Sequence, residues 1–309
     1  MQLTVAICTW NRCDLLRQTL ARMTELVVPG GVDWELLVVN NNSSDATDEV
    51  IASFAGRLPV RRLFEARPGK SNALNLAARE ARGTYILWTD DDVLVDSQWI
   101  AEYHRAFLHW PDASIFGGAI DPWFAGTPPR WLQQALPRVG NVYATRDLGG
   151  EPLPLSDECL PYGANMAVRR ADQLRYLYDP SLGPRPESVF GGEETKVLRA
   201  MLADGATGWY VPRARVRHYI AEHRQTTRYL RRYFLGYGEA CARPAGERSE
   251  LTVLGRPLWL WKQVVTEETR YRVRRLTSEP DVWIEDLISS SLSWGQFRAF
   301  ASGGVRQAG

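Results

Sequence analysis

Three consecutive aspartates, Asp90, Asp91 and Asp92, follow the apolar run YILWT and are the first candidates for chemistry in this sequence. Like charges this close repel one another unless a cation or another positive group neutralises them. Alternate residues of an extended segment point the same way, so Asp90 and Asp92 could share an ion while Asp91 faces elsewhere. Carboxylate oxygens favour Mg²⁺ or Mn²⁺. The alternative is a solvated acidic turn, but the position after a buried strand favours a metal site.

Two further groups could act on a bound sugar or ion. Glu193 and Glu194 open a helical pattern, where carboxylates also stabilise the positive end of the helix dipole. A carboxylate beside a bound sugar could instead remove the proton of an attacking hydroxyl, and Glu194 is the preferred base. The neutral imidazole of His218 would complete a metal site begun by Asp90 and Asp92, although a lone histidine is more often a satisfied core or surface group.

A basic stripe follows His218. We predict that Arg224, Arg228 and Arg231 lie at i, i+4 and i+7 on one helix. Such a stripe could grip a diphosphate or anionic lipid headgroups, or it could simply be solvated.

Alternating strands and helices must position these residues. Apolar runs predict strands, and helical spacing predicts helices, in the order strand 3–8, helix 16–27, strand 34–39, strand 60–64, helix 71–82, strand 85–89 and helix 97–110. This alternation predicts an α/β fold with a Rossmann-like, mostly parallel sheet and helices on both faces. Ligands bind beyond the carboxyl ends of such strands, so Thr9, Asn40 and Asp90 should converge there.

The rest of the chain is less regular. Residues 116–161 are rich in Gly, Pro and Trp, which predicts an ordered but irregular excursion whose aromatic residues could form a substrate wall. A helix is expected at 191–204 and a short strand at 208–211, before a break at Pro212. We therefore expect an α/β domain over residues 1–217 and a mainly helical region over residues 218–309.

Composition excludes some classes of function. With 37 Lys and Arg against 36 Asp and Glu, the net charge of +1 gives no reason to expect a nucleic-acid partner. The four cysteines lack the spacing of a zinc site or a disulfide framework, which favours a reducing cytosol. Neither a leader nor an apolar run of about 18 residues is evident, so we expect a cytoplasmic protein. Peripheral contact with the inner face of a membrane stays open.

Seven motifs in one order carry a family resemblance. They are TWNR at 9–12, VVNNNSSDAT at 38–47, RPGKSNALN at 67–75, TDDDV at 89–93, PYGANMAVRR at 161–170, GGEE at 191–194 and His218. Over roughly residues 1–240 they resemble the family 2 inverting glycosyltransferases with a GT-A fold. The resemblance implies that residues 1–217 form the catalytic domain that binds a nucleotide-sugar.

Roles for individual residues follow from this resemblance. It implies that Thr9, Trp10 and Arg12 line the nucleotide pocket and that Asn40 reads the base edge. Lys70 and Asp91 join the donor site, and Mn²⁺ or Mg²⁺ held by Asp90, Asp92 and His218 bridges the diphosphate. Glu194 matches the catalytic base, with Glu193 as the other candidate. The resemblance also implies that Gly163, Ala164 and Asn165 lie near the reacting sugar. From the basic stripe described above, we expect Arg224 to be a further substrate contact.

Two positions depart from the family pattern. Asn40 stands where Asp is common, so an amide must contact the base, which bears on the expected preference for uridine. Glu194 also stands where Asp is usual and is one methylene longer. The expected reaction is metal-dependent, inverting transfer from a nucleoside-diphosphate donor, a UDP-sugar, to a hydroxyl of a saccharide, a lipid-linked sugar or a small molecule.

Two other functions are weighed against this one. A sugar-phosphate nucleotidylyltransferase also uses a Rossmann-like layer and metal-binding aspartates, but it would open with a longer Gly-rich phosphate loop than TWNR. A non-catalytic nucleotide- or saccharide-binding module would gain little from Asp90, Asp92 and Glu194. The tryptophan-containing segments after about residue 240 could pack as a core, form a homodimer or rest on a membrane.

Overall fold

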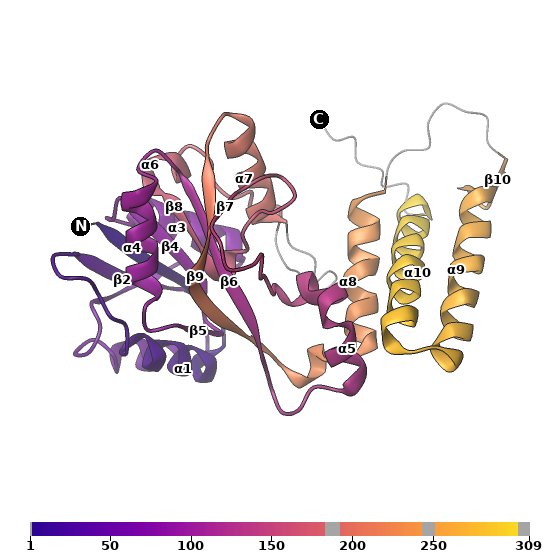
Figure 1. Ribbon diagram of the computed structural model, residues 1–309, viewed down its shortest axis with the longest axis horizontal. Coiled ribbons are helices and arrows are strands. Elements are labelled where there is room, and N and C mark those ends of the chain that lie inside the picture. Colours follow the sequence, from indigo (N-terminus) through magenta and orange to yellow (C-terminus); the bar gives the residue numbers. More distant parts are fainter. Residues whose placement is uncertain (1, 183–191, 243–250, 302–309) are drawn as a thin grey trace. The chain divides into compact units, whose positions relative to one another are not determined.

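A computed structural model describes residues 2–182, 192–242 and 251–301 (Figure 1). The chain divides into two compact units. The first comprises the described residues of Met1–Trp123, Tyr143–Gly183 and Gly191–Tyr219. The second comprises Phe124–Val142 and the described residues that follow Tyr219. Gly191, the first residue of the GGEE motif, lies outside the described residues.

The first unit is an α/β layer around one mixed sheet. Its strands are β1 (Leu3–Thr9), β2 (Trp34–Asn40), β3 (Val60–Phe64), β4 (Tyr85–Asp90), β5 (Val93–Val95), β6 (Ile115–Phe124), β7 (Leu153–Pro154), β8 (Met166–Arg169) and β9 (Gly208–Ile220). Its helices are α1 (Cys13–Met23), α2 (Thr47–Ala52), α3 (Lys70–Glu80), α4 (Trp99–His109), η2 (Gly163–Asn165), α6 (Arg170–Gln173) and α7 (Glu193–Ala203). The predicted α/β class is confirmed.

The sheet is parallel on the side that carries most of the predicted site. The strand order is β3-β2-β1-β4-β8-β6-β9-β5, and β3, β2, β1 and β4 are mutually parallel. Strand β8 pairs antiparallel with both β4 and β6, and β9 pairs antiparallel with β5 and β7. Strands β1, β2 and β4 are apolar and almost wholly buried, as expected for parallel strands that helices cover on both faces.

The strand register brings distant polar residues to one edge. Thr9 at the end of β1 pairs with Asn40 at the end of β2, and Cys8 of β1 pairs with Asp90 at the end of β4. The predicted convergence of Thr9, Asn40 and Asp90 at the carboxyl ends of the strands is therefore confirmed.

The segment expected to be an irregular excursion is largely regular. It contains the ten-residue strand β6, the helix α5 (Arg130–Val139) and the short helix η1 (Gly140–Tyr143). The glycine pair in β6 is needed for close packing, because a Cβ on Gly118 would lie 2.0 Å from the carbonyl oxygen of Ala214. The prediction of an irregular segment is therefore wrong for these elements. Gly118 allows β6 to pack closely, and Pro129 directly precedes α5.

Strand β9 is longer than the sequence pattern predicted. It continues through Pro212 to Ile220. Ala214, Val216 and His218 are buried and alternate with arginines that are at least partly exposed, which is a period-two pattern. The predicted break at Pro212 is wrong, and His218 belongs to the strand rather than to a following loop.

The second unit is mainly helical, and α10 lies between α8 and α9 (Figure 1). Besides α5, it contains η3 (Glu222–Arg224), α8 (Thr227–Ala240), β10 (Thr252–Val253), β11 (Arg256–Pro257), α9 (Leu258–Thr277) and α10 (Pro280–Ala301). Glycines let α8 and α10 cross closely, because a Cβ on Gly238 would lie 2.3 Å from the carbonyl oxygen of Leu292. Within the described ranges, no helix is both long and apolar enough to span a bilayer.

Candidate active site

The aspartate triplet lies in the tight connection between β4 and β5. Asp90 ends β4 and is partly exposed, whereas Asp91 and Asp92 are buried. Because β5 begins at the next residue, Val93, the backbone on both sides of the triplet is fixed by the sheet. Three carboxylates are therefore held together at the carboxyl edge of β4.

Arg12 neutralises two of these carboxylates. Its Nη1 lies 3.0 Å from Asp91 Oδ1 and 2.9 Å from Asp92 Oδ2. Thr9 also donates its hydroxyl to Asp91 Oδ2 at 2.8 Å. Burial raises the pKa of Asp91 to about 6, although the Arg12 charge opposes this shift. Asp91 is thus engaged by Thr9 and Arg12 and is not part of the group formed by Asp90, Asp92 and His218.

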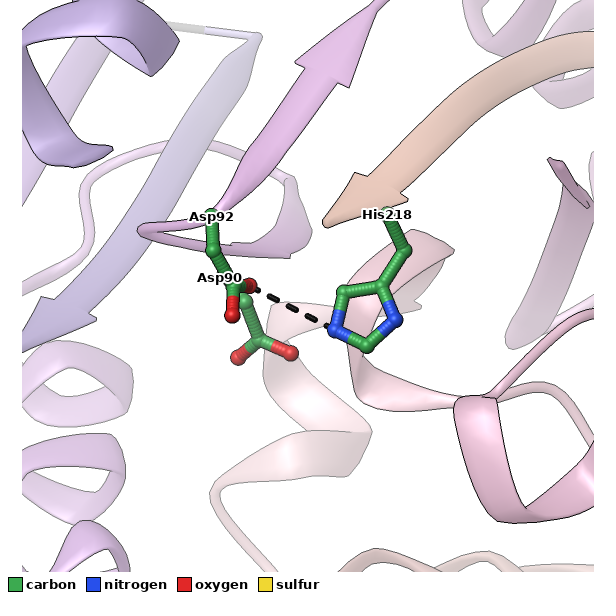
Figure 2. A group of neighbouring side chains, drawn as sticks. All are labelled: Asp90, Asp92 and His218. Carbon is green, nitrogen blue, oxygen red and sulfur yellow. Dashed lines mark ion pairs between the residues drawn. The ribbon is translucent and has the colours of Figure 1, made fainter. Parts of the chain in front are cut away.

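Asp90 at the end of β4, Asp92 in the turn before β5 and His218 of β9 come together (Figure 2). One potential ligand atom from each residue lies within 4.8 Å of the others, and His218 Nε2 is 3.5 Å from Asp92 Oδ1. The other ring nitrogen of His218, Nδ1, is 2.8 Å from the carbonyl oxygen of Tyr143. A carbonyl can only accept, so Nδ1 donates a proton to it, and Nε2, which faces Asp92, is the nitrogen that could ligate an ion. Two carboxylates and one imidazole suit Mn²⁺ or Mg²⁺.

Lys70 joins the triplet to the glutamate pair. Its Nζ lies 3.2 Å from Asp90 Oδ1 and 3.0 Å from Glu194 Oε1. Burial opposes the lysine charge, but Asp90 and Glu194 outweigh it and raise the pKa of Lys70 well above its usual value. Acidic groups more than 100 residues apart in sequence therefore share one ammonium group.

The two glutamates have different surroundings. Glu194 is partly exposed, and its Oε2 accepts a hydrogen bond from the Gly163 amide at 3.2 Å. Glu193 is only 3 % exposed, and its Oε2 has no hydrogen-bond partner among the described residues. Burial and the neighbouring Glu194 raise the pKa of Glu193. Of the pair, Glu194 has the access that a base for an incoming hydroxyl requires.

The residues expected at the nucleotide differ in how they are presented. Trp10 is 61 % exposed beside the carboxyl end of β1, so its ring is available for stacking. Asn40 is buried and holds its own loop: Nδ2 donates to Asp48 Oδ1 at 2.7 Å, and Oδ1 accepts from the Ser43 amide at 2.8 Å. Asn40 thus shapes the loop after β2, and its predicted contact with the base stays a prediction.

Asn165 is a positioning residue. Its side chain is fully buried, and Oδ1 accepts from Trp99 Nε1 at 2.8 Å and from the Tyr103 hydroxyl at 2.7 Å. Its Nδ2 donates to the carbonyl oxygens of Ala119 and Ala214 at 2.8 and 2.7 Å. With all four of these bonds made, the side chain has no group left for a sugar hydroxyl. Its expected position near the reacting sugar stays a prediction.

Gly163 and Ala164 stand closer to the reacting groups. A Cβ on Gly163 would lie 2.1 Å from Glu194 Oε1, so only glycine leaves the glutamate its place. The Ala164 carbonyl accepts a hydrogen bond from the Thr89 hydroxyl at 3.0 Å, which ties η2 to the end of β4. Backbone geometry, rather than the alanine side chain, connects this segment with the site.

Arg224 belongs to the second unit. It ends η3, before α8 begins at Thr227, so the predicted single helical stripe of three arginines is wrong. Its guanidinium lies 5.3 Å from the centre of the Tyr229 ring, and Arg231 pairs with Glu268 at 2.6 Å. The predicted contact of Arg224 with substrate stays a prediction.

Two supporting groups were missed from the sequence. The Tyr143 carbonyl orients His218 across 75 positions, and the Thr19 hydroxyl donates to the Asp91 carbonyl at 2.9 Å. Neither belongs to a motif, and backbone carbonyls carry no residue-type signal. Only the placement of η1 and α1 on the sheet reveals them.

Comparison with known proteins gives a consistent picture. Residues 4–169, more than half of the chain, match the family described as Glycosyl transferase family 2. Validoxylamine A glucosyltransferase from Streptomyces hygroscopicus subsp. jinggangensis (strain 5008) is 33 % identical over 155 residues, covering 48 % of this chain and 36 % of that protein. Poly-beta-1,6-N-acetyl-D-glucosamine synthase from Staphylococcus epidermidis is 29 % identical over 91 residues, 29 % of this chain and 21 % of that protein. The chain thus matches about a third or less of these relatives' lengths.

Solved structures share the fold. The mannosyltransferase PcManGT from Pyrobaculum calidifontis, in complex with GDP-Man and Mn²⁺, has a TM-score of 0.61 at 17 % identity, covering 97 % of this chain and 87 % of that one. S. aureus TarS 1-349 has a TM-score of 0.55 at 12 % identity, covering 99 % and 93 %. These likenesses support the GT-A glycosyltransferase fold.

Proposed function

Because this chain belongs to glycosyl transferase family 2, we propose that it transfers a sugar from a UDP-sugar to an acceptor hydroxyl with inversion at the anomeric carbon. Membership makes it a glycosyltransferase, so the nucleotidylyltransferase and the non-catalytic binder are set aside. The nucleotide, the inversion and the residue roles below form the proposal.

One observation carries the proposal: Lys70 contacts Asp90 and Glu194 at the same time, at 3.2 and 3.0 Å. The aspartates that would face a diphosphate and the carboxylate that would receive a proton therefore lie on one site rather than on opposite faces. An inverting transfer needs this arrangement, because the hydroxyl must attack the anomeric carbon from the side opposite the departing diphosphate.

Each group then has a part in the reaction. Glu194 accepts the proton of the acceptor hydroxyl as its oxygen bonds to the anomeric carbon and the bond to the diphosphate oxygen breaks. Asp90, Asp92 and His218 would hold Mn²⁺ or Mg²⁺, which supplies Lewis-acid stabilisation of the departing diphosphate. Arg12 fixes Asp91 and Asp92, and Gly163 holds Glu194 through its amide.

The proposed donor is argued from Trp10 and from the relatives named above. Trp10 is exposed for stacking on a base, and the relatives named above are a glucosyltransferase and an N-acetylglucosamine polymer synthase, which supports a hexosyl donor. TarS 1-349 has been solved with UDP and PcManGT with GDP-Man, so these neighbours support a nucleoside-diphosphate donor, and the choice of uridine rests on the motifs. We propose a saccharide, lipid-linked sugar or small-molecule hydroxyl as acceptor. The cytoplasmic location stays a prediction.

The decisive experiment separates chemistry from donor binding. We expect Glu194→Gln to lower turnover of UDP-sugar with Mn²⁺ by a factor of about 10²–10⁴, because the amide cannot accept the proton. The Kd for UDP should change little, since the glutamine keeps one oxygen for the Gly163 N–H and Lys70 keeps its ion pair with Asp90. Turnover is measured as UDP release, and binding by isothermal titration.

Glu193→Gln is the matched control. It removes a carboxylate from the same helix turn, and Glu193 is too buried to reach an acceptor, so most of the turnover should remain. Loss of turnover in Glu193→Gln with a normal rate in Glu194→Gln would assign the base to Glu193. Normal rates in both variants would contradict a carboxylate base on α7.

A further inference from the structure

The second unit exposes large apolar side chains along one continuous segment, the hairpin β10–β11 and the helix α9. These residues, which we call the apolar stripe, are Leu251, Val253, Leu254, Leu258, Trp259, Val265, Val273 and Leu276. Leu258, Val265 and Leu276 are spaced by about two and three helical turns, so they lie on one line along α9. The other side of α9, with Leu260, Val264 and Tyr271, is buried. The helix therefore has a buried apolar side and, opposite it, a line of exposed apolar side chains.

The tip of the hairpin is unusual for a turn that faces only water. Leu254 and Gly255 form the connection between the paired residues Val253 and Arg256, with φ angles of 53° and 71°. Such turns favour Asn-Gly or Asp-Gly, because a side chain such as leucine is strained at positive φ. The Leu254 side chain is 78 % exposed, so its packing inside the unit does not compensate for this strain. The leucine at this tip is therefore accessible to an apolar surface outside the unit.

The charge around the apolar stripe identifies the kind of partner. Residues 251–278 contain six basic and two acidic side chains, a net charge of +4, whereas the whole chain has +1. Both acidic groups are engaged inside the unit: Glu268 pairs with Arg231 and Arg272, and Glu267 bonds to Ser293.

The remaining basic residues keep this surface positive. Asp286 of α10 pairs with Arg270 and Arg274, but it is buried, and Lys262 stays exposed in the middle of the stripe. A second copy of the chain would bring like charges together. A surface of anionic lipid headgroups above an apolar layer complements both features.

We propose that the apolar stripe docks α9 and the hairpin on an anionic lipid bilayer, with the helix in the plane of the interface. Leu254 and the outward side chains of α9 enter the boundary between headgroups and acyl chains, and Trp259 lies at headgroup depth. Lys262 and the flanking arginines contact the lipid phosphates. This property is independent of the proposed glycosyl transfer.

Flotation of the full chain with vesicles tests the proposal. We expect binding to vesicles that contain phosphatidylglycerol, weaker binding to pure phosphatidylcholine, and weaker binding as salt increases. The triple variant Leu254→Asn, Val265→Gln, Leu276→Gln should lower the partition coefficient at least about tenfold, since three apolar side chains no longer leave water. Asn suits the positive φ of position 254, and Leu276 is 87 % exposed, so the melting temperature should not fall.

Leu108→Gln is the control, because Leu108 is exposed on α4 in the first unit and should not affect binding. Lys262→Gln should weaken binding to anionic vesicles and leave binding to neutral vesicles unchanged. Equal flotation of the wild type and the triple variant, or no flotation of the wild type, overturns the proposal. A dimer in solution that the triple variant dissociates, without vesicle binding, would assign the stripe to a second copy instead.

Discussion

At the scale of single residues, the site is organised by cations of the protein as well as by its carboxylates. Arg12 and Lys70 contact all three aspartates, so the triplet is stable as a charge cluster before any ion binds. His218 is held by the Tyr143 carbonyl in the tautomer that can ligate a metal. These contacts offset part of the cost of burying the triplet, although burial still raises the pKa of Asp91.

Removal of one ligand should separate metal binding from folding. We expect Asp92→Asn to raise the Mn²⁺ concentration for half-maximal turnover at least about tenfold, because one charged ligand is lost. Chelation by EDTA should abolish turnover of the wild type, and added Mn²⁺ should restore it. The measurement is UDP release across a Mn²⁺ titration.

Asp157→Asn is the control, because Asp157 is an exposed acid that pairs only with the exposed Arg199 among the described residues. Its metal response should match that of the wild type. An Asp92→Asn variant with an unchanged Mn²⁺ dependence would remove Asp92 from the ligand set.

At the scale of elements, one buried asparagine ties a helix to a sheet. Asn165 at the end of η2 bonds to two aromatic side chains of α4 and to backbone carbonyls of β6 and β9. Gly163, two residues earlier, contacts Glu194. The hydrogen bonds of Asn165 therefore fix the position of η2, whose Gly163 amide binds the proposed base Glu194.

Replacement of Asn165 should strongly lower the stability of the fold. We expect Asn165→Ala to lower the free energy of unfolding by about 3–5 kcal/mol, because two carbonyls, an indole and a phenol lose a buried partner. Chemical denaturation measures this change. Asn72→Ala, which removes a single exposed hydrogen bond to Pro68, should cost less than about 1 kcal/mol. Similar losses of unfolding free energy in the two variants would contradict a structural role for the Asn165 hydrogen bonds.

At the scale of the whole molecule, the two units are stabilised differently. The first unit packs apolar strands and helices. The second unit has a smaller apolar cluster around Leu260, Val264 and Phe297, and its described helices also meet through the buried polar residues Asp286 and Ser290 and the partly buried Glu268. Burial opposes ionisation of Glu268, but hydrogen bonds from Ser290, Arg272 and Arg231 outweigh it and lower its pKa to about 2. Protonation of Glu268 should therefore destabilise the second unit in acid.

The pH dependence has a definite sign. A depressed pKa stabilises the fold fully above the usual value of 4.5, and this contribution is lost as the pH falls toward 2. We expect Glu268→Gln to reduce stability near neutral pH by on the order of 2 kcal/mol and to flatten the loss between pH 4.5 and 2. Unfolding followed by circular dichroism at several pH values measures both effects. Glu279→Gln, at an exposed site, should show the wild-type profile, and an equal slope for Glu268→Gln would refute the assignment.

The sequence alone determined the α/β class, the strands of the parallel half and the convergence of Thr9, Asn40 and Asp90. These follow from short-range signals, because apolar periodicity defines each strand and parallel strands present their ends at one edge. The motifs in order also pointed to the family that the comparison then showed.

Only the tertiary structure decided which groups complete the site. Lys70 between Asp90 and Glu194, and Tyr143 behind His218, are contacts between segments far apart in sequence, and no local pattern encodes their distance. The same holds for β6, where glycines that resemble a break allow two backbones to approach. Long-range packing sets the orientation and burial of a side chain, and here that distinguishes Glu194 from Glu193.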